Sequence, residues 1–486
     1  MMARVGLPGG SGSLVAGALV LFLASLNVAL GAGVASGRTL PVALGALLPA
    51  IIIGALALVA SNRAVLLYIA LGIQFTASAV NDPLPIAGAL TLFTADLLLT
   101  LAVGAWLAGR LMIRRSRERP SWLRTPVLGL PLLLLSVALF RGLLEGSERY
   151  GASLLGMPLR LALFAAIATT ISDVTPREAM RGITVVFYTG TVWLTGVAAY
   201  HIATGTSQTE YSALSTGGIR YLSTGSAIYL SAALVLALIN LASEARFGRR
   251  SIHLAIAGLA VFDVAVAQTR GAFVGLALVI SLLVLRSARL RRSLFAFAPL
   301  IVLLAVLAAL VVPRVVPDLA PALAARLTAA PATDANVVWR ERAARVALAG
   351  VSQEPLLGIG FGRQATFKIN GEPNVITGDP HNGFIYLLAG GGVFALASFV
   401  LLLLVYLFDT WRRMATAHGI ERDLILWAVG SWAIFTLQVF SEPVLTSPSY
   451  ILTLWILMLL PAIVPRRSKG QPPEPVVAPL TAPSSA

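Results

Sequence analysis

Gly378-Asp379-Pro380-His381-Asn382-Gly383, followed by the apolar run from Phe384 to Phe408, is the stretch that decides the fold. The run is longer than the roughly 20 apolar residues that a membrane crossing needs. Pro380 donates no backbone hydrogen bond and its ring fixes φ, so it suits the turn just before a helix. The stretch therefore predicts a polar turn that places His381 and Asn382 where a long helix enters the bilayer. A histidine there can titrate near neutral pH and act as a general base.

Composition indicates a membrane protein over the whole chain. Of 486 residues, 57% are hydrophobic and only 12% are charged, and the mean hydropathy is +0.86. A soluble domain cannot hide that much apolar surface, so we expect a polytopic membrane protein in contact with membrane lipids. The net charge of +15 does not indicate a nucleic-acid partner, because the basic residues form short clusters between apolar runs. The chain has no cysteine and hence no disulfide.

The expected fold is all-α, with about 14 transmembrane helices. The apolar region from Ile252 to Leu285 is too long for one crossing at about 1.5 Å per residue, so we divide it at Gln268-Thr269-Arg270-Gly271. The first segment resembles a signal peptide, but the topology works best if it remains as a span. The predicted spans lie near 14–34, 41–60, 64–80, 90–112, 125–140, 153–172, 182–202, 222–242, 252–267, 271–286, 294–312, 383–408, 424–440 and 448–464.

Arginine-rich loops alternate with arginine-poor loops, which predicts the orientation. Positively charged loops stay in the cytoplasm, so both termini are expected on the cytoplasmic side of the cell membrane. The long loop 313–381 is then extracytoplasmic. Within it, Asp334 to Ser352 predicts an amphipathic helix capped by Asp334 or Asn336. The predicted division is eleven spans in 1–312, the loop in 313–381, three spans in 382–464, and a disordered cytoplasmic tail in 465–486.

Four arginines are expected on the outer side against this charge bias: Arg160, Arg220, Arg270 and Arg340. Guanidinium groups pair well with diphosphate oxygens, so their convergence beside His381 would form a site for a lipid diphosphate. Each arginine taken singly also fits an interfacial side chain that reaches lipid phosphates. Arg160 is the deepest, and its structural alternative is an ion pair with Glu145 or Glu148.

Other titratable residues carry competing hypotheses. His201 is a rival base at the outer end of its span, whereas His253 and His418 are expected to be cytoplasmic and solvated. Asp96 and Asp263 lie within spans and each could pair with an arginine; Asp263 and Arg270 are about two helical turns apart. As proton carriers, these aspartates would instead favour a transporter.

No motif for a metal or cofactor is found. The chain lacks His-Glu-x-x-His, clustered carboxylates, a Walker loop and a dinucleotide fingerprint. We therefore expect no metal and no cofactor. Arginines can replace a cation in stabilising a diphosphate leaving group.

Two segments together give the chain a family resemblance. Glu354-Pro355-Leu356-Leu357-Gly358-Ile359-Gly360-Phe361-Gly362, followed by His381-Asn382, resembles the O-antigen ligase and polymerase superfamily. Thr269-Arg270-Gly271 is similar to its Ser-Arg-Gly element, and Arg340 is similar to the arginine that starts its loop helix. Arg220 is loosely similar to another of its arginines. Gly392 matches one of its glycines.

The chain departs from that superfamily at three positions. Gly390 stands where an acid is frequent, Ala395 where a second glycine is frequent, and Ala344 where a tryptophan is common. These departures leave ligase, polymerase and protein-glycosylating activities open, with a polymerase slightly favoured over a ligase.

The resemblance implies a metal-independent glycosyltransferase with a helical fold like that of the lipid-linked-donor (GT-C) enzymes. It implies an undecaprenyl-diphosphate-linked glycan as donor at the outer leaflet and a glycan or lipid as acceptor. His381 would be the base, Asn382 would orient it or bind sugar, and Arg220, Arg270, Arg340 and Arg160 would hold the diphosphate. The alternatives are a multi-pass transporter of an anion or lipid-linked glycan, and a noncatalytic scaffold.

Overall fold

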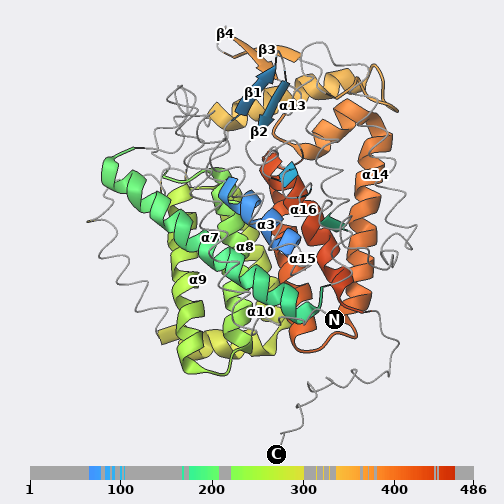
Figure 1. Ribbon diagram of the computed structural model, residues 1–486. Helices are drawn as coiled ribbons and strands as arrows, with labels where there is room; N and C mark the ends of the chain where they lie inside the picture. The colour runs from blue at the N-terminus through green and yellow to red at the C-terminus, as the bar shows by residue number, and fades with distance from the viewer. Residues whose placement is uncertain are drawn as a thin grey trace, which may run out of the picture.

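The structure is a computed structural model, and most of its described part is helical (Figure 1). It describes residues 65–77, 83–87, 90–93, 174–206, 221–299, 335–361, 365–369, 372–376, 380–442 and 448–465, with a few single positions between them. The helices are α3 (Val65–Ala77), α7 (Pro176–Thr204), α8 (Thr224–Ser243), α9 (Phe247–Ala267), α10 (Arg270–Arg286), α13 (Ala335–Val351), α14 (Gly383–Met414), α15 (Ile420–Gln438) and α16 (Pro448–Leu459), which a 3-10 turn, Leu460–Ile463, extends.

Within the described residues, four helices are long and apolar enough to cross a membrane: α7, α8, α9 and α14. A fifth candidate is α10 together with the helix Ala288–Pro299 that follows it. The predicted spans 222–242 and 252–267 correspond to α8 and α9, and the predicted break near Thr269 separates α9 from α10. The chain is therefore a multi-pass membrane protein. The predicted spans before residue 64, the one near 125–140, all of 153–172 except residues 167 and 168, and the tail after 465 lie outside the described residues.

Local sequence signals explain where α7 begins and ends. The Thr175 side chain accepts a hydrogen bond from the Glu178 amide, and the Glu178 carboxylate accepts one from the Thr175 amide. This reciprocal arrangement satisfies two amides that the helix itself leaves unpaired. Pro176 follows at the first helical position, where its missing N–H costs nothing. Gly205 ends the helix in the left-handed conformation that glycine adopts without steric cost.

The central helix of the described bundle is α8, whose residues are buried almost throughout. It packs against α7, α9, α10 and α15. The Trp427 indole of α15 donates a 3.0 Å hydrogen bond to the Ala232 carbonyl of α8. Tyr229 of α8 packs between Phe75, Phe187 and Phe435, with ring centroids 5.2 to 6.5 Å apart. These aromatic contacts join α3, α7, α8 and α15 into one core.

One end of the helix bundle collects basic residues, and we call it the arginine-rich end. There, Ser243 at the end of α8 donates a 2.8 Å hydrogen bond to Asp423 at the start of α15. Arg286 at the end of α10 lies 5.0 Å from the ring centroid of Trp411 near the end of α14. The arginines that these helix ends and their connections carry are Arg246, Arg249, Arg250, Arg286, Arg289, Arg291, Arg292, Arg412, Arg413 and Arg422.

The other end, which we call the histidine end, holds the starts of α10 and α14 and the end of α15. The Gly383 amide of α14 donates a 2.7 Å hydrogen bond to the Val439 carbonyl that follows α15. A Cβ added at Gly271 of α10 would meet the Gln438 side chain of α15, so these two helix ends also touch. Figure 1 shows α13 across this end, beside the start of α14.

Two short hairpins correct the all-α prediction. Strands β1 (Pro83–Ala87) and β2 (Leu90–Phe93) pair antiparallel, and so do β3 (Ala365–Ile369) and β4 (Glu372–Ile376). The predicted span 90–112 is therefore wrong at its start, because its first four residues form β2. Apolar runs of this length do not distinguish strand from helix, and the prolines of β1 favour the extended conformation.

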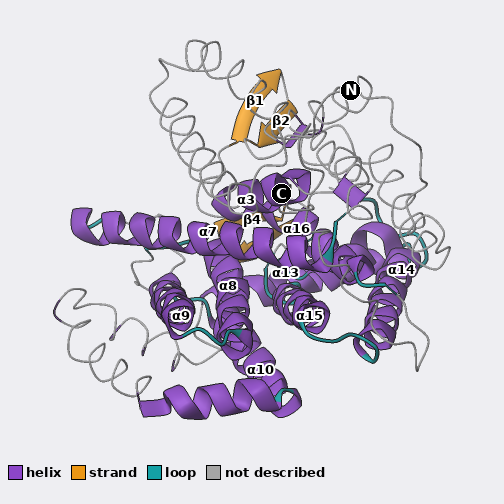
Figure 2. Cartoon of the chain, turned by 60° about the horizontal axis from the view of Figure 1, so that its bottom comes forward, coloured by secondary structure: helices purple, strands orange, loops and turns teal. Residues whose placement is uncertain are grey.

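The predicted span 294–312 also starts differently. The helix Ala288–Pro299 begins earlier and turns by 110° from α10, and Figure 2 shows it continuing from the end of α10 in a different direction. Its first residues include Arg289, Arg291 and Arg292, whose charges favour a position at the membrane surface over one within it. Residues 300–312 lie outside the described part of the chain.

Candidate active site

The start of α14 is fixed by Asn382. Its side-chain oxygen accepts hydrogen bonds of 3.1 Å from the amides of Phe384 and Ile385, so it caps the helix. This contact commits the amide oxygen to the fold, and only the NH2 group remains to contact a substrate. The bond between Gly383 and Val439 holds the same turn against α15. His381 is therefore presented from a rigid junction between two helices.

His381 itself has a left-handed backbone, with φ of 55°. A side chain in this region is uncommon, and such strain persists only where surrounding contacts hold it. The Trp339 ring of α13 packs edge-on against the imidazole, with centroids 5.0 Å apart and planes 87° apart. This contact with Trp339 restricts the orientation of the imidazole ring.

The surroundings of His381 favour its neutral form. Burial of the imidazole, and then the nearby Arg340 guanidinium, lower the pKa of His381 from 6.5 to about 4. This finding differs from the predicted titration near neutral pH, because sequence does not show how deeply the ring is buried. At neutral pH the ring carries no charge and has a nitrogen lone pair able to accept a proton.

Arg340 pairs with an acid that follows α15, and its charge also acts on His381. Its guanidinium is 3.2 Å from the Glu442 carboxylate, with side chains 37% and 16% exposed. Glu442 in turn is anchored by its amide, which donates a 2.7 Å hydrogen bond to the Gln438 carbonyl. Arg340 is therefore held at the histidine end by α15, although its helix belongs to the loop.

The loop helix α13 lies where Asp334 to Ser352 predicts it, and the β3–β4 hairpin packs on it. Arg342 donates a 2.5 Å hydrogen bond to the Lys368 carbonyl of β3. The Trp339 and Phe367 rings lie 5.9 Å apart. The hairpin thus holds the face of α13 that carries Trp339 and Arg340 toward the start of α14.

A kink in α14 receives the glycine-rich segment of the loop. Gly392 has φ of 66° and ψ of −165°, which interrupts the helix. Backbone groups freed by this break pair with the loop instead: the Val393 amide donates to Pro355, and the Ala389 carbonyl accepts from Ile359. Residues 355–360 are thereby hydrogen-bonded into the gap in the helix.

Glycine is required on both sides of this docking contact. Gly358 has φ of 71°, and a Cβ there would come within 2.6 Å of the Ala389 carbonyl oxygen. A Cβ at Gly392 would lie 2.6 Å from the Leu357 amide nitrogen. Both positions combine a positive φ with a close backbone approach, so a side chain fits at neither.

The four predicted arginines differ in what the structure shows. Arg340 lies next to His381, and Arg270 is a half-buried residue that opens α10 beside the end of α15. Arg160 and Arg220, like Asp96, lie outside the described residues. The structure thus brings Arg340 and His381 together and places Arg270 at the same end of the bundle.

Two predictions on other polar residues are wrong. Asp263 does not pair with Arg270: its carboxylate accepts a 2.7 Å hydrogen bond from Thr195 of α7, because one face of α9 packs on α7. His253 is not solvated but half-buried, and lies 2.7 Å from the Tyr188 hydroxyl. His418 is exposed, as expected. His201 lies in the last turn of α7, which ends far from α13 in Figure 1.

Residues 255–400 match the family model described as O-antigen ligase. The match covers less than a third of the chain and supports the O-antigen ligase/polymerase superfamily. This confirms the resemblance, and the matched residues run from α9 through α13 to the kinked part of α14, so they include Arg270, Arg340 and His381. No curated protein matches the chain.

Within the segment that matches the O-antigen ligase model, Gly390 leaves no room for a side chain. A Cβ at Gly390 would lie 2.6 Å from an edge atom of the Phe361 ring, and Phe361 is fully buried. The same ring packs 5.0 Å from the Tyr386 ring. In this chain, the space that a side chain at position 390 would need is filled by the Phe361 ring of the docked loop.

The sequence did not single out Trp339 and Glu442 as site residues. Glu442 carries a weak signal, because an acid directly after an apolar span on the outer side would face the predicted arginines. Trp339 carries none beyond its position before Arg340. Within the described residues, no group of three or more histidines and acids could hold a metal ion. The described site is thus a neutral imidazole, an aromatic ring and an arginine–glutamate pair.

Proposed function

We propose that this chain is a glycosyltransferase that transfers or polymerises glycan from a polyprenyl-diphosphate-linked donor at the outer face of the cytoplasmic membrane. The observation that carries the proposal is the packing of α13 at His381, where the Trp339 ring contacts the imidazole and the adjacent Arg340 brings its positive charge close. A base and a phosphate-binding cation, side by side where a helix enters the bilayer, are the two groups that such a transfer needs.

In the proposed reaction, His381 accepts the proton of an acceptor sugar hydroxyl. The hydroxyl oxygen bonds to the anomeric carbon of the donor, and the bond from that carbon to the diphosphate oxygen breaks. The polyprenyl diphosphate leaves with the bonding electrons, and arginines stabilise its increasing negative charge. This electrostatic role requires no metal ion, since Arg340 and Arg270 already supply fixed positive charge, joined in our proposal by Arg160 and Arg220.

Arg340 would have to share its charge between Glu442 and the donor. The ion pair is partly exposed, so it contributes little stability of its own and can rearrange at small cost. Donor binding also adds negative charge beside His381, which raises its pKa and makes it a stronger base when the substrate is present. The site is therefore suited to become more basic only in the complex.

The outer location rests on the distribution of arginines. His381, Trp339 and Glu442 lie at the histidine end, and the arginine clusters lie at the opposite end. Because clustered arginines remain in the cytoplasm, the histidine end is assigned to the outer side. Both chain termini would then be cytoplasmic, and 313–381 would form the outer loop.

The deciding experiment is transfer by purified protein in detergent, from a labelled undecaprenyl-diphosphate oligosaccharide to added glycan or lipid A acceptors. Product in detergent supports an enzyme, whereas activity only in sealed vesicles supports a transporter. His381→Ala should lower the rate by about 10²- to 10⁴-fold at unchanged protein level. His201→Ala, at the rival histidine in the last turn of α7, is the matched control and should leave the rate unchanged. Wild-type transfer by His381→Ala would remove the histidine from the mechanism.

A further inference from the structure

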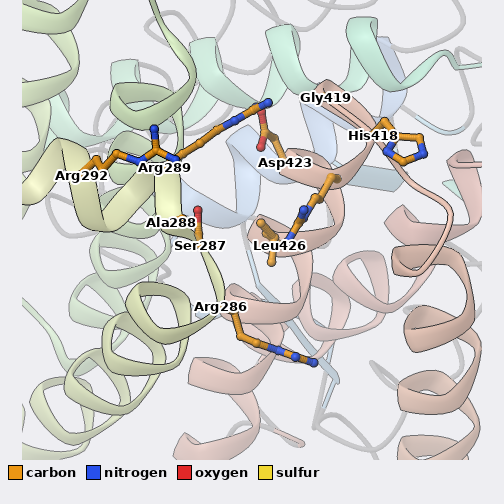
Figure 3. A pocket seen from close by; sticks show the side chains of 10 residues that line it. Arg286, Ser287, Ala288, Arg289, Arg292, His418, Gly419, Asp423 and Leu426 are labelled. Atoms are coloured by element: carbon orange, nitrogen blue, oxygen red, sulfur yellow. The ribbon is translucent and has the colours of Figure 1, made fainter.

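A cavity of about 400 Å³ lies at the arginine-rich end, far along the bundle from His381. The end of α10, the start of α15 and the helix Ala288–Pro299 enclose it (Figure 3). The ionisable residues that line it are Arg286, Arg289, Arg292, Arg422, His418 and Asp423. The function proposed above uses none of them.

Positive charge in this cavity exceeds the negative charge available to balance it. Four arginines face one acid, Asp423, in its lining. Asp423 already accepts a 2.8 Å hydrogen bond from Ser243, and Figure 3 shows the Arg289 side chain extending toward Asp423. One carboxylate cannot neutralise four guanidinium groups, so the cavity is suited to a polyvalent anion.

Large apolar side chains are exposed beside the cavity, as expected where a protein meets membrane lipid. Leu285 and Phe295 are each 74% exposed, one on α10 and one on the helix Ala288–Pro299. The 110° turn between these helices directs the second away from the axis of α10, as expected for a helix at a membrane surface. Trp411 lies under the Arg286 guanidinium, and tryptophan is favoured at this depth. A ligand with both a phosphate and acyl chains matches these two features together.

We propose that this cavity binds the phosphate headgroup of an anionic phospholipid of the inner leaflet. Arg289, Arg292 and Arg422 contact the phosphate oxygens, and the acyl chains lie along Leu285 and Phe295. Basic pockets between membrane helices on the cytoplasmic side commonly recognise such headgroups. A free phosphate offers the same oxygens but lacks the chains, so the two sources can be distinguished.

The test uses the full chain, purified in mild detergent and analysed by native mass spectrometry with defined lipids. The pocket variant is R289Q/R292Q/R422Q, and the control is R246Q/R249Q/R291Q. The control removes the same charge from the same end but from residues outside the cavity lining. R289K/R292K/R422K keeps the charge and tests a variant with less risk to folding. Probes are phosphatidylglycerol, phosphatidylethanolamine and inorganic phosphate.

We expect the wild type and the control to retain phosphatidylglycerol over phosphatidylethanolamine. The pocket glutamine variant should lose that retention by roughly fivefold for each arginine removed, and the lysine variant should keep part of it. Equal loss in the control would overturn the proposal, because only bundle-end charge would matter. Equal retention of inorganic phosphate and of phosphatidylglycerol by the wild type would overturn the assignment to a lipid. Unchanged retention of phosphatidylglycerol by both pocket variants would overturn the proposal that the cavity is the binding site.

Discussion

The Arg340 guanidinium lies 3.2 Å from the Glu442 carboxylate, and the same guanidinium lowers the pKa of the His381 imidazole. One arginine thus connects the loop helix, the end of α15 and the predicted base. Removing either partner of the pair tests how this charge is divided.

Glu442→Gln frees Arg340 for the donor, and Arg340→Gln removes it. We expect the KM for the lipid-linked donor to fall in Glu442→Gln and to rise roughly 10- to 100-fold in Arg340→Gln, the cost of a lost charged hydrogen bond. Steady-state transfer in detergent measures both. Arg345→Gln is the control, because Arg345 is on the same helix, exposed, and paired with Glu341. A rise in KM in both site variants would show that the pair only holds the fold.

The lowered pKa of His381 predicts an unusual pH profile. A base with an ordinary histidine pKa loses activity below about pH 6.5, whereas here kcat/KM should remain level between about pH 6 and 8 and fall near pH 4. Arg340→Gln removes one of the two causes and should move this acid limb to higher pH. An inflection near pH 6.5 in the wild type would contradict the structure at this residue.

The same shift predicts an effect on stability. Unfolded His381 binds its proton near pH 6.5, but the folded residue does so only near pH 4. The unfolded chain therefore binds more protons between these values, and the free energy of unfolding falls as the pH is lowered through this window. Thermal unfolding from pH 7 to 4 checks this, with His381→Gln expected to reduce the fall.

Trp339 is expected to act by positioning the imidazole. Trp339→Ala should lower kcat by about tenfold with little change in donor KM, since an edge-to-face pair contributes only about 0.5–1.5 kcal/mol. Trp339→Phe keeps an aromatic edge and should retain most activity. Equal loss of kcat in the two variants would show that the effect of Trp339 on kcat does not come from its ring contact with His381.

Gly392→Ala should release the docked loop from α14. Its φ of 66° and the nearby Leu357 amide leave no room for a methyl group, and the strain is expected to cost about 1–3 kcal/mol. Limited proteolysis near residues 355–362 should accelerate. Gly258→Ala is the control, because open space surrounds that helical position. Equal protection of both variants would mean that the kink tolerates a side chain.

The positions of the helices were largely predictable, because the length of an apolar run and the arginines that flank it are both local features of the sequence. Residues 222–242 predicted α8, and Thr269 marked the break between α9 and α10. The start of the predicted span 90–112 was wrong, since a short apolar run fits a strand equally well.

The site was predictable only in part. His381 and Arg340 were identified by residue type and the resemblance. Glu442 lies 102 residues from Arg340 in the chain, so its contact depends on how α13 and α15 pack. The pKa of His381 depends on how deeply the imidazole is buried. Asp263 accepts a hydrogen bond from Thr195 because α9 packs against α7. Contacts between residues so far apart in the chain cannot be inferred from local sequence patterns.

The hydrogen bond between Gly383 and Val439 also sets an order of assembly during synthesis. The apolar part of α14 beyond Gly392 can enter the bilayer as soon as it leaves the ribosome. The first turn of α14, however, can form its hydrogen bond only after Val439, more than fifty residues later, has been synthesised. A nascent chain that stops before Val439 would have the histidine without its anchor. We expect such truncated chains to insert normally and yet leave 380–391 open to protease.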